Sequence, residues 1–328
     1  MRTMHKGHHK KTSHTIVYGF LAVSILLVSY SLFASGEDGR TAFKSRLGEP
    51  LIRTKQTASS LDAFSYLSRN REIPDPTLSA ASSLVWDSTT SKPLWEQNSA
   101  ERRPIASITK LVTAAVVSNM SKMDEPVVVS DLAIETQGES GNLHPGEALT
   151  VDALLQALLL ESSNDAAMAL AEHVEEYTGK DFVSLMNSQA LKFGMKDSLF
   201  QDPAGLTDES AYSTTRDLAS LLDKLRTNQE YSRVWEILQN ATLTTFSADG
   251  GFVHTFENTN PFLQELAGVV GGKTGFTNAA GQSMVLVVKS PDSSRELYYI
   301  VLGSTDRFGD IRTLINWTGS AYIWEQRQ

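Results

Sequence analysis

The sequence contains no cysteine, and this absence excludes several kinds of site at once. Without thiols the chain can form no disulfide, hold no metal through thiolate ligands and use no cysteine nucleophile. Positive charge is also scarce, because 38 acidic side chains outnumber 29 lysines and arginines and give a formal net charge of −9. Proteins that bind nucleic acid usually present a basic surface, so no nucleic acid partner is expected.

Histidine is scarce as well, with seven in the whole sequence. Those beyond residue 15 are His144, His173 and His254, which are widely separated along the chain. They show none of the tight spacings typical of metal ligands, so the sequence predicts no metal and no cofactor. We interpret these three side chains as structural or surface residues, and the earlier histidines as part of a polar tail.

The N-terminal residues predict a membrane segment. Residues 1–15 are basic, and residues 16–34 contain no charged side chain. As a helix rising about 1.5 Å per residue, this segment would span roughly 28 Å, close to the hydrocarbon thickness of a bilayer. The basic flank predicts a cytoplasmic N-terminus and an exported remainder. We expect a single-pass signal anchor in the cell membrane, or a secreted protein if cleavage occurs near Ala34.

The remaining sequence divides into a linker and one folded domain. Residues 35–76 mix polar and charged side chains without a sustained period, so they predict a linker. Residues 77–328 predict a strand hairpin, then helices, then further strands and a closing helix. The predicted helices and strands are 80–86, 92–96, 108–117, 127–129, 151–160, 166–177, 181–193, 214–225, 241–246, 269–276, 283–289, 296–302 and 310–325. This order favours an α+β fold.

A serine and a lysine lie one turn apart at the start of an apolar run. Pro104 predicts a helix start, which places Ser107 in the first turn and Lys110 on the same face. A serine hydroxyl needs a neighbouring base, but an exposed lysine is protonated at neutral pH because its reference pKa is about 10.4. Burial and a second cation both lower a lysine pKa. The pair therefore predicts another positive group near Ser107, although Ser-x-x-Lys alone is more often an ordinary helix start.

Two further motifs follow in the chain. Ser162-Ser163-Asn164 lies between two predicted helices, where such residues are also common as N-caps. Gly271-Gly272-Lys273-Thr274-Gly275 lies on a predicted strand, where glycines often mark close approach of a ligand or another backbone. Lys273 would supply the second cation, although a bulged surface strand explains this motif equally well. The three motifs together, in this order and on these elements, are much harder to obtain by chance.

With these motifs, the sequence from about Leu78 onward resembles the low-molecular-mass penicillin-binding proteins, the serine-type D-alanyl-D-alanine carboxypeptidase family. The similarity extends to Asp202-Pro203-Ala204-Gly205-Leu206 and to the stretch from Asn258 to Gly281. It implies a β-lactamase/transpeptidase-like fold. In that fold an antiparallel sheet packs with terminal helices beside an all-helical lobe, and the active site lies at the seam.

The resemblance implies catalytic roles for the first two motifs. Ser107 would be the acylated nucleophile, and Lys110 its base. Ser162 would relay a proton to the leaving D-alanine, while Asn164 would hold Lys110 and an amide of the substrate.

The resemblance also implies a substrate-binding role for the third motif. Lys273 and Thr274, beside Gly275, would bind the terminal carboxylate of the peptide. The oxyanion hole would consist of the backbone N–H groups of Ser107 and Phe276. The implied partners are peptidoglycan stem peptides ending in D-Ala-D-Ala, with β-lactams as acylating inhibitors.

Alternative functions remain open at this point. Many members of this family carry an additional C-terminal β-domain, for which this sequence leaves no residues, so DD-endopeptidase activity is not separated from carboxypeptidase activity. A non-catalytic peptidoglycan-binding or penicillin-binding protein is also possible. A class A β-lactamase needs a deacylating glutamate, but none lies between Glu176 and Glu209, so slow penicilloyl hydrolysis is expected. A Ser-His-Asp hydrolase is disfavoured because no Gly-x-Ser-x-Gly turn surrounds Ser107.

Overall fold

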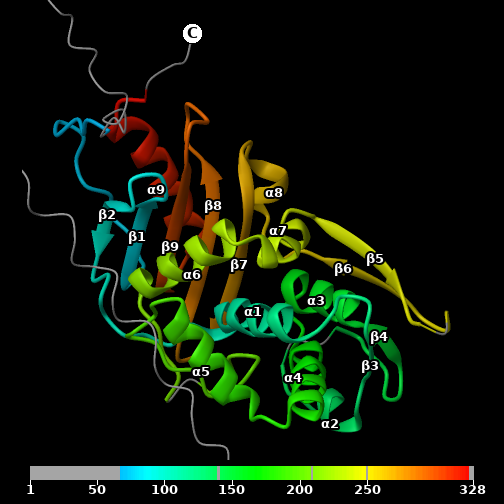
Figure 1. Cartoon of the computed structure of the whole chain (residues 1–328). Coiled ribbons are helices and arrows are strands. Elements are labelled where there is room, and N and C mark those ends of the chain that lie inside the picture. Colours follow the sequence, from blue (N-terminus) through cyan, green and yellow to red (C-terminus); the bar gives the residue numbers. More distant parts are fainter. Residues whose placement is uncertain (1–66, 139–140, 208–209, 249, 325–328) are drawn as a thin grey trace, which may run out of the picture. The chain divides into compact units, whose positions relative to one another are not determined.

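The computed structural model describes residues 67–138, 141–207, 210–248 and 250–324. Within these ranges, an N-terminal strand hairpin is followed by helices and then by a set of strands that ends in α9 (Arg307–Ala321). Figure 1 shows a sheet with α9 on one side and a group of helices on the other. The predicted α+β fold is confirmed.

The central sheet joins the two ends of the described chain. Its five strands are antiparallel and lie in the order β2-β1-β9-β8-β7. Their bounds are β1 Ser82–Asp87, β2 Lys92–Gln97, β7 Val269–Thr277, β8 Gly281–Lys289 and β9 Glu296–Ser304. The N-terminal hairpin thus pairs with the last strand, and β7 forms the edge at which the helical lobe begins.

Both faces of this sheet are buried, which explains why its inner strands are almost continuously apolar. In β1, Leu84 packs in the core shared with the helical lobe, whereas Val85 packs in the core beneath α9. In β9, Ile300 and Val301 divide in the same way. A strand covered on both sides loses the polar alternation of a half-exposed strand.

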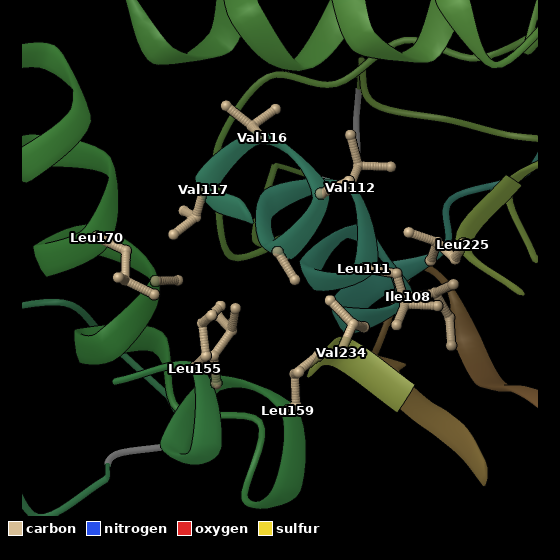
Figure 2. Close-up of a cluster of buried hydrophobic side chains, with 14 of the residues drawn as sticks. Ile108, Leu111, Val112, Val116, Val117, Leu155, Leu159, Leu170, Leu225 and Val234 are labelled. Atoms are coloured by element: carbon tan, nitrogen blue, oxygen red, sulfur yellow. The ribbon is translucent and has the colours of Figure 1, made fainter. Parts of the chain in front are cut away.

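Helix α1 (Lys110–Met120) is the centre of the helical lobe, and every residue from Lys110 to Val117 is buried. In Figure 2 its apolar side chains meet Leu155, Leu159, Leu170, Leu225 and Val234 from the surrounding helices. These and the other helices are α2 Asp131–Ile134, α3 Val151–Leu160, α4 Asn164–Thr178, α5 Phe182–Lys192, α6 Thr215–Thr227, α7 Ser232–Leu238 and α8 Phe262–Glu265. Short 3-10 turns occupy η1 (Ala106–Thr109) and η2 (Gln229–Tyr231).

Two small sheets complete the fold. The lobe contains the pair β3 (Pro126–Val128) and β4 (Ala148–Thr150), so it is not built from helices alone. A second hairpin joins β5 (Thr242–Phe246) and β6 (Val253–Glu257). The sequence analysis missed α2, β4, α7, β6 and α8, because each is at most seven residues long and too short to show a sustained hydrophobic period.

The last part of the predicted linker belongs to the folded domain. Ile323 donates its backbone N–H to Ser68, and Asn70 donates to Ala321. The indole of Trp317 donates to the carbonyl oxygen of Pro74 at 2.9 Å. The predicted membrane segment, residues 16–34, lies outside the described residues. Among the helices that the structure describes, none has the length and apolar composition needed to cross a membrane.

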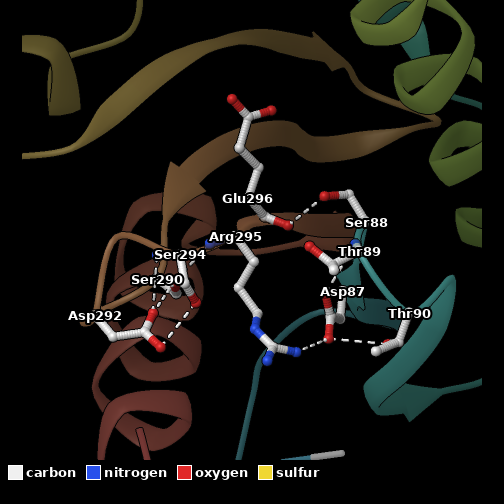
Figure 3. A network of polar contacts seen from close by, with 9 residues as sticks. All are labelled: Asp87, Ser88, Thr89, Thr90, Ser290, Asp292, Ser294, Arg295 and Glu296. Carbon is white, nitrogen blue, oxygen red and sulfur yellow. Dashed lines mark hydrogen bonds and ion pairs between the residues drawn. The ribbon is translucent and has the colours of Figure 1, made fainter. Parts of the chain in front are cut away.

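A buried polar network holds together two turns at one end of the sheet (Figure 3). Asp87, at the end of β1, accepts a hydrogen bond from Arg295 at 2.7 Å, and both side chains are nearly inaccessible to solvent. Asp87 also accepts from the backbone of Thr89 and the hydroxyl of Thr90, so it fixes the β1–β2 turn. Arg295 precedes β9, and the ion pair therefore ties the N-terminal hairpin to the β8–β9 turn.

Candidate active site

Ser107 lies in a single 3-10 turn. This corrects the sequence-based prediction, which places Ser107 in the first turn of the helix. The turn η1 ends at Thr109, and α1 begins at Lys110. Ala106 adopts a φ of 49°, in the left-handed region that L-residues seldom occupy, and this breaks the approach to the helix. In a 3-10 turn the side chains at positions i and i+3 eclipse each other, so Lys110 Nζ lies 2.9 Å from Ser107 Oγ.

Lys110 is completely buried and held by three acceptors. Its ammonium donates to Ser107 Oγ, to Asn164 Oδ1 at 2.7 Å and to the carbonyl oxygen of Ala204 at 2.7 Å. The amine is thus fixed beside the hydroxyl in a position from which it can exchange a proton with Ser107.

The connection between α3 and α4 places Ser162 and Asn164. Ser163 is the residue that caps α4, since its hydroxyl accepts from the backbone N–H of Ala166 at 2.9 Å. Its two neighbours are therefore available for other contacts. Asn164 binds Lys110 and donates from Nδ2 to the carbonyl oxygen of Gln137 at 2.7 Å. The hydroxyl of Ser162 is buried and has no hydrogen-bond partner among the described residues.

Strand β7 approaches the Ser107 turn closely at Gly275. A Cβ atom there would lie 2.8 Å from the carbonyl oxygen of Ile105 and 3.1 Å from the backbone nitrogen of Ser107. Side chains two apart on a strand share a face, so Lys273 projects from the same face of β7 as Gly275. Lys273 is buried, with Nζ 3.2 Å from the carbonyl oxygen of Thr274. The structure thus brings the first and third motifs together.

The other third-motif residues are placed at the edge of the sheet. The hydroxyls of Thr274 and Thr259 lie 2.6 Å apart. The side chain of Phe276 is largely exposed. Arg307, which sequence reasoning missed, donates from Nη1 to the carbonyl oxygen of Gly275 at 2.9 Å. Burial lowers the pKa of Arg307 from its usual value. The contact links the start of α9 to β7.

The loop of residues 202–207, which the sequence analysis included in the family resemblance without assigning it a role, is a further part of the site. Its carbonyl at Ala204 accepts from Lys110, and a Cβ on Gly205 would overlap the carbonyl oxygen of Ala106. Asp202 organises this loop by accepting backbone N–H groups, including that of Thr207 at 2.8 Å. Burial works to raise the pKa of Asp202, but the hydrogen bonds from Leu206 and its neighbours outweigh it and lower the pKa.

One group of side chains in the described residues has the composition of a metal site. His144 and Glu147 lie in the segment before β4, and His254 lies on β6. No spacing in the sequence indicates this group, because His254 is 107 positions from Glu147. His173 lies outside it, with Nε2 3.5 Å from Glu125.

Comparison with known proteins gives consistent matches. Residues 69–306 match the family model described as D-alanyl-D-alanine carboxypeptidase. The chain is 28% identical to the D-alanyl-D-alanine carboxypeptidase DacF of Bacillus subtilis, over 74% of this chain and 63% of that relative, so it spans less than two thirds of DacF. It is 32% identical to a D-alanyl-D-alanine endopeptidase of Pseudomonas aeruginosa, over 75% and 79% of the two chains. The solved structure of the Streptomyces K15 DD-transpeptidase matches with a TM-score of 0.68 and 26% identity, over 76% of this chain and 100% of that one.

Proposed function

The chain belongs to the D-alanyl-D-alanine carboxypeptidase family, and on that basis we propose that it removes the terminal D-alanine from peptidoglycan stem peptides through an acyl-serine intermediate. The observation that carries this proposal is the contact between Lys110 Nζ and Ser107 Oγ at 2.9 Å. The side chain of Lys110 is completely buried. A nucleophile and its base within hydrogen-bond reach, with the base oriented by a third group, is the arrangement that acyl transfer needs. Asn164 is that third group.

In the proposed first step, Lys110 in its neutral form accepts the proton of Ser107 Oγ. The oxygen attacks the carbonyl carbon of the penultimate D-alanine. The C–N bond to the terminal D-alanine then breaks, and the leaving amine receives a proton through Ser162, whose buried hydroxyl is unpartnered within the described structure. Water hydrolyses the resulting ester and regenerates Ser107. General acid–base transfer of this kind typically contributes about 10²–10⁴ in rate.

Substrate binding is assigned to β7 and the turn that it touches. Lys273 and Thr274 bind the terminal carboxylate. The Lys-Thr-Gly motif on β7 resembles that of the family and supplies a cation and a hydroxyl next to Gly275, which has no side chain. The backbone N–H groups of Ser107 and Phe276 form the oxyanion hole. Donors of this kind are typically worth about 3 kcal/mol to the transition state. The close packing of Gly275 on the Ser107 turn supports this assignment, since a larger residue would separate the two N–H groups.

We also propose that residues 16–34 anchor the chain in the cell membrane with the catalytic domain outside the cytoplasm. The apolar run and the basic flank before it support this orientation. It places the domain on the side where peptidoglycan lies. Release of the chain from the membrane fraction by a salt wash alone would contradict the proposal.

Endopeptidase activity is the second candidate, and the comparisons include specific support for it. The chain is 32% identical to the D-alanyl-D-alanine endopeptidase of Pseudomonas aeruginosa and 30% identical to that of Escherichia coli, and it covers 79% and 78% of these relatives. Both activities use the same acyl-serine chemistry and differ only in whether the leaving group is free D-alanine or a cross-linked peptide.

The full chain, purified in mild detergent, is expected to release D-alanine from a pentapeptide ending in D-Ala-D-Ala. The Ser107→Ala variant, which removes the nucleophile and keeps the fold, is expected to release none above background. A cross-linked muropeptide dimer is assayed in parallel. Cleavage of the dimer without D-alanine release would replace carboxypeptidase by endopeptidase activity, and turnover of neither substrate would contradict the proposed function.

A further inference from the structure

His144, Glu147 and His254 converge at the junction between β4 and the β5–β6 hairpin. Their potential ligand atoms all lie within 4.8 Å of one another. His254 Nε2 lies 2.6 Å from Glu147 Oε1, and His144 Nδ1 lies 3.6 Å from Glu147 Oε2. The junction itself is tied by a hydrogen bond from the backbone of Ala248 to that of Ala148 at 2.8 Å. Figure 1 shows that β4 and the hairpin lie at the same end of the molecule.

We propose that these three side chains bind a zinc ion that joins the β5–β6 hairpin to the segment before β4. Two imidazoles and one carboxylate form a ligand set typical of Zn²⁺, with bonds of about 2.0–2.2 Å. In a tetrahedral site such bonds separate the ligand atoms by roughly 3.4 Å. The separations of 2.6 Å and 3.6 Å lie on either side of this value, so small side-chain shifts are sufficient. The ion takes the place of the proton between His254 and Glu147.

The surroundings hold the ligands in position. The ring of His144 stacks on Phe252 with centroids 4.1 Å apart, and the ring of His254 stacks on Phe256 at 5.7 Å. The carboxylate of Glu147 also accepts the backbone N–H of His144 at 3.1 Å, so both ligands from this segment are fixed relative to each other. Partners of this kind orient metal ligands and raise affinity.

The burial of the three side chains also fits a metal site with one open coordination position. The side chains of Glu147 and His254 are 0% and 6% exposed, whereas that of His144 is 51% exposed. The buried pair gives the ion a dry environment, and the exposed ring leaves access for the ion and for water as a fourth ligand. A hydrogen bond between Glu147 and His254 alone would explain the positions of these two side chains but not that of His144.

The proposed zinc site lies close in sequence to residues that hold the catalytic side chains in place. Gly141, three residues before His144, donates its backbone N–H to Asp165 at 2.9 Å. Asp165 follows Asn164, which binds Lys110. A bound ion therefore strengthens the packing of a segment that contacts the second motif, without taking part in the chemistry at Ser107. The sequence-based expectation of no metal rested only on spacing along the chain.

The test compares the melting temperature of the full chain in zinc and in EDTA. Wild-type protein is expected to melt about 5 °C higher in zinc at about 100 times the dissociation constant. His144→Gln should lose most of this shift, because it removes a ligand and leaves the buried pair intact. His173→Gln is the matched control and should keep the shift. Magnesium should give no shift, since imidazole does not favour it.

The design separates this site from the histidines near the N-terminus. A tail that binds zinc equally in the folded and unfolded states does not change the melting temperature. Each variant is compared with itself in EDTA, so any change in intrinsic stability cancels, and His254→Gln provides a second ligand deletion. Absence of a zinc shift in the wild type, or a shift in both ligand variants as large as that of the wild type, would overturn the proposal. Neither outcome bears on turnover at Ser107.

Discussion

Methionine in place of Lys110 should slow the acylation of Ser107 by a penicillin by a factor of about 10³, within the range that a general base contributes. Methionine has a similar length and apolar body but no group that accepts the proton of Ser107. The change also leaves Asn164 Oδ1 and the Ala204 carbonyl without their donor, so a loss of stability accompanies it. The rate is measured with a fluorescent penicillin on protein whose circular dichroism shows it to be folded.

Arg295→Met is the matched control for this experiment. It also removes a buried cation and leaves the buried carboxylate of Asp87 uncompensated, at a cost of about 3 kcal/mol or more. Arg295 lies in the network of Figure 3, where it serves the turns of the sheet. We expect this variant to be less stable and to acylate at the wild-type rate. A Lys110→Met variant that acylates within threefold of wild type would exclude Lys110 as the base.

Alanine at Gly205 should abolish acylation and reduce the free energy of unfolding by about 2–5 kcal/mol. Two effects add at this position. Gly205 has a φ of 81°, which costs an L-residue about 1–2 kcal/mol. In addition, the new Cβ would overlap the carbonyl oxygen of Ala106 and lie 2.6 Å from its carbonyl carbon. These are backbone atoms of the Ser107 turn, so the loop must move away and withdraw the Ala204 carbonyl from Lys110.

Gly194→Ala separates the two effects. Gly194 has the same φ of 81°, but a Cβ there meets no atom within 4 Å. This variant should lose only the backbone contribution of about 1–2 kcal/mol and keep its penicillin reactivity. Chemical denaturation gives the stabilities, and penicillin labelling gives the activities. Equal effects of the two substitutions would show that contact between the loop and the Ser107 turn is unimportant.

Much of the fold was predictable because its signals are local. Thr150 caps α3 by accepting the backbone N–H of Ala153 at 3.1 Å, and a threonine directly before an apolar run is a local signal of a helix start. Gly179 ends α4 with a φ of 64°, which only glycine adopts without strain. The long apolar runs of β8 and β9 also predicted strands. Both faces of the sheet are covered, so these strands are apolar along most of their length.

The pairing of Ser107 with Lys110 was likewise predictable, because three residues of separation bring the two side chains together in either kind of helix. The local geometry was not predictable. The 3-10 turn depends on the positive φ of Ala106, and the loop at Ala204 reaches Lys110 from 94 positions away. The group of His144, Glu147 and His254 depends in the same way on a contact between distant segments. The roles of all the predicted site residues stay predictions, in catalysis for Ser107, Lys110 and Ser162 and in substrate binding for Asn164, Lys273, Thr274, Gly275 and Phe276.

The most direct measurement is mass spectrometry of the intact protein after incubation with a penicillin, followed by peptide mapping of the adduct. The acyl-serine account predicts one penicilloyl group on Ser107. This adduct should persist, because no glutamate lies between Glu176 and Glu209 to activate a deacylating water. Ser107→Ala should carry no adduct. Wild-type protein without an adduct, an adduct on another residue, or rapid hydrolysis of the penicillin would contradict the account.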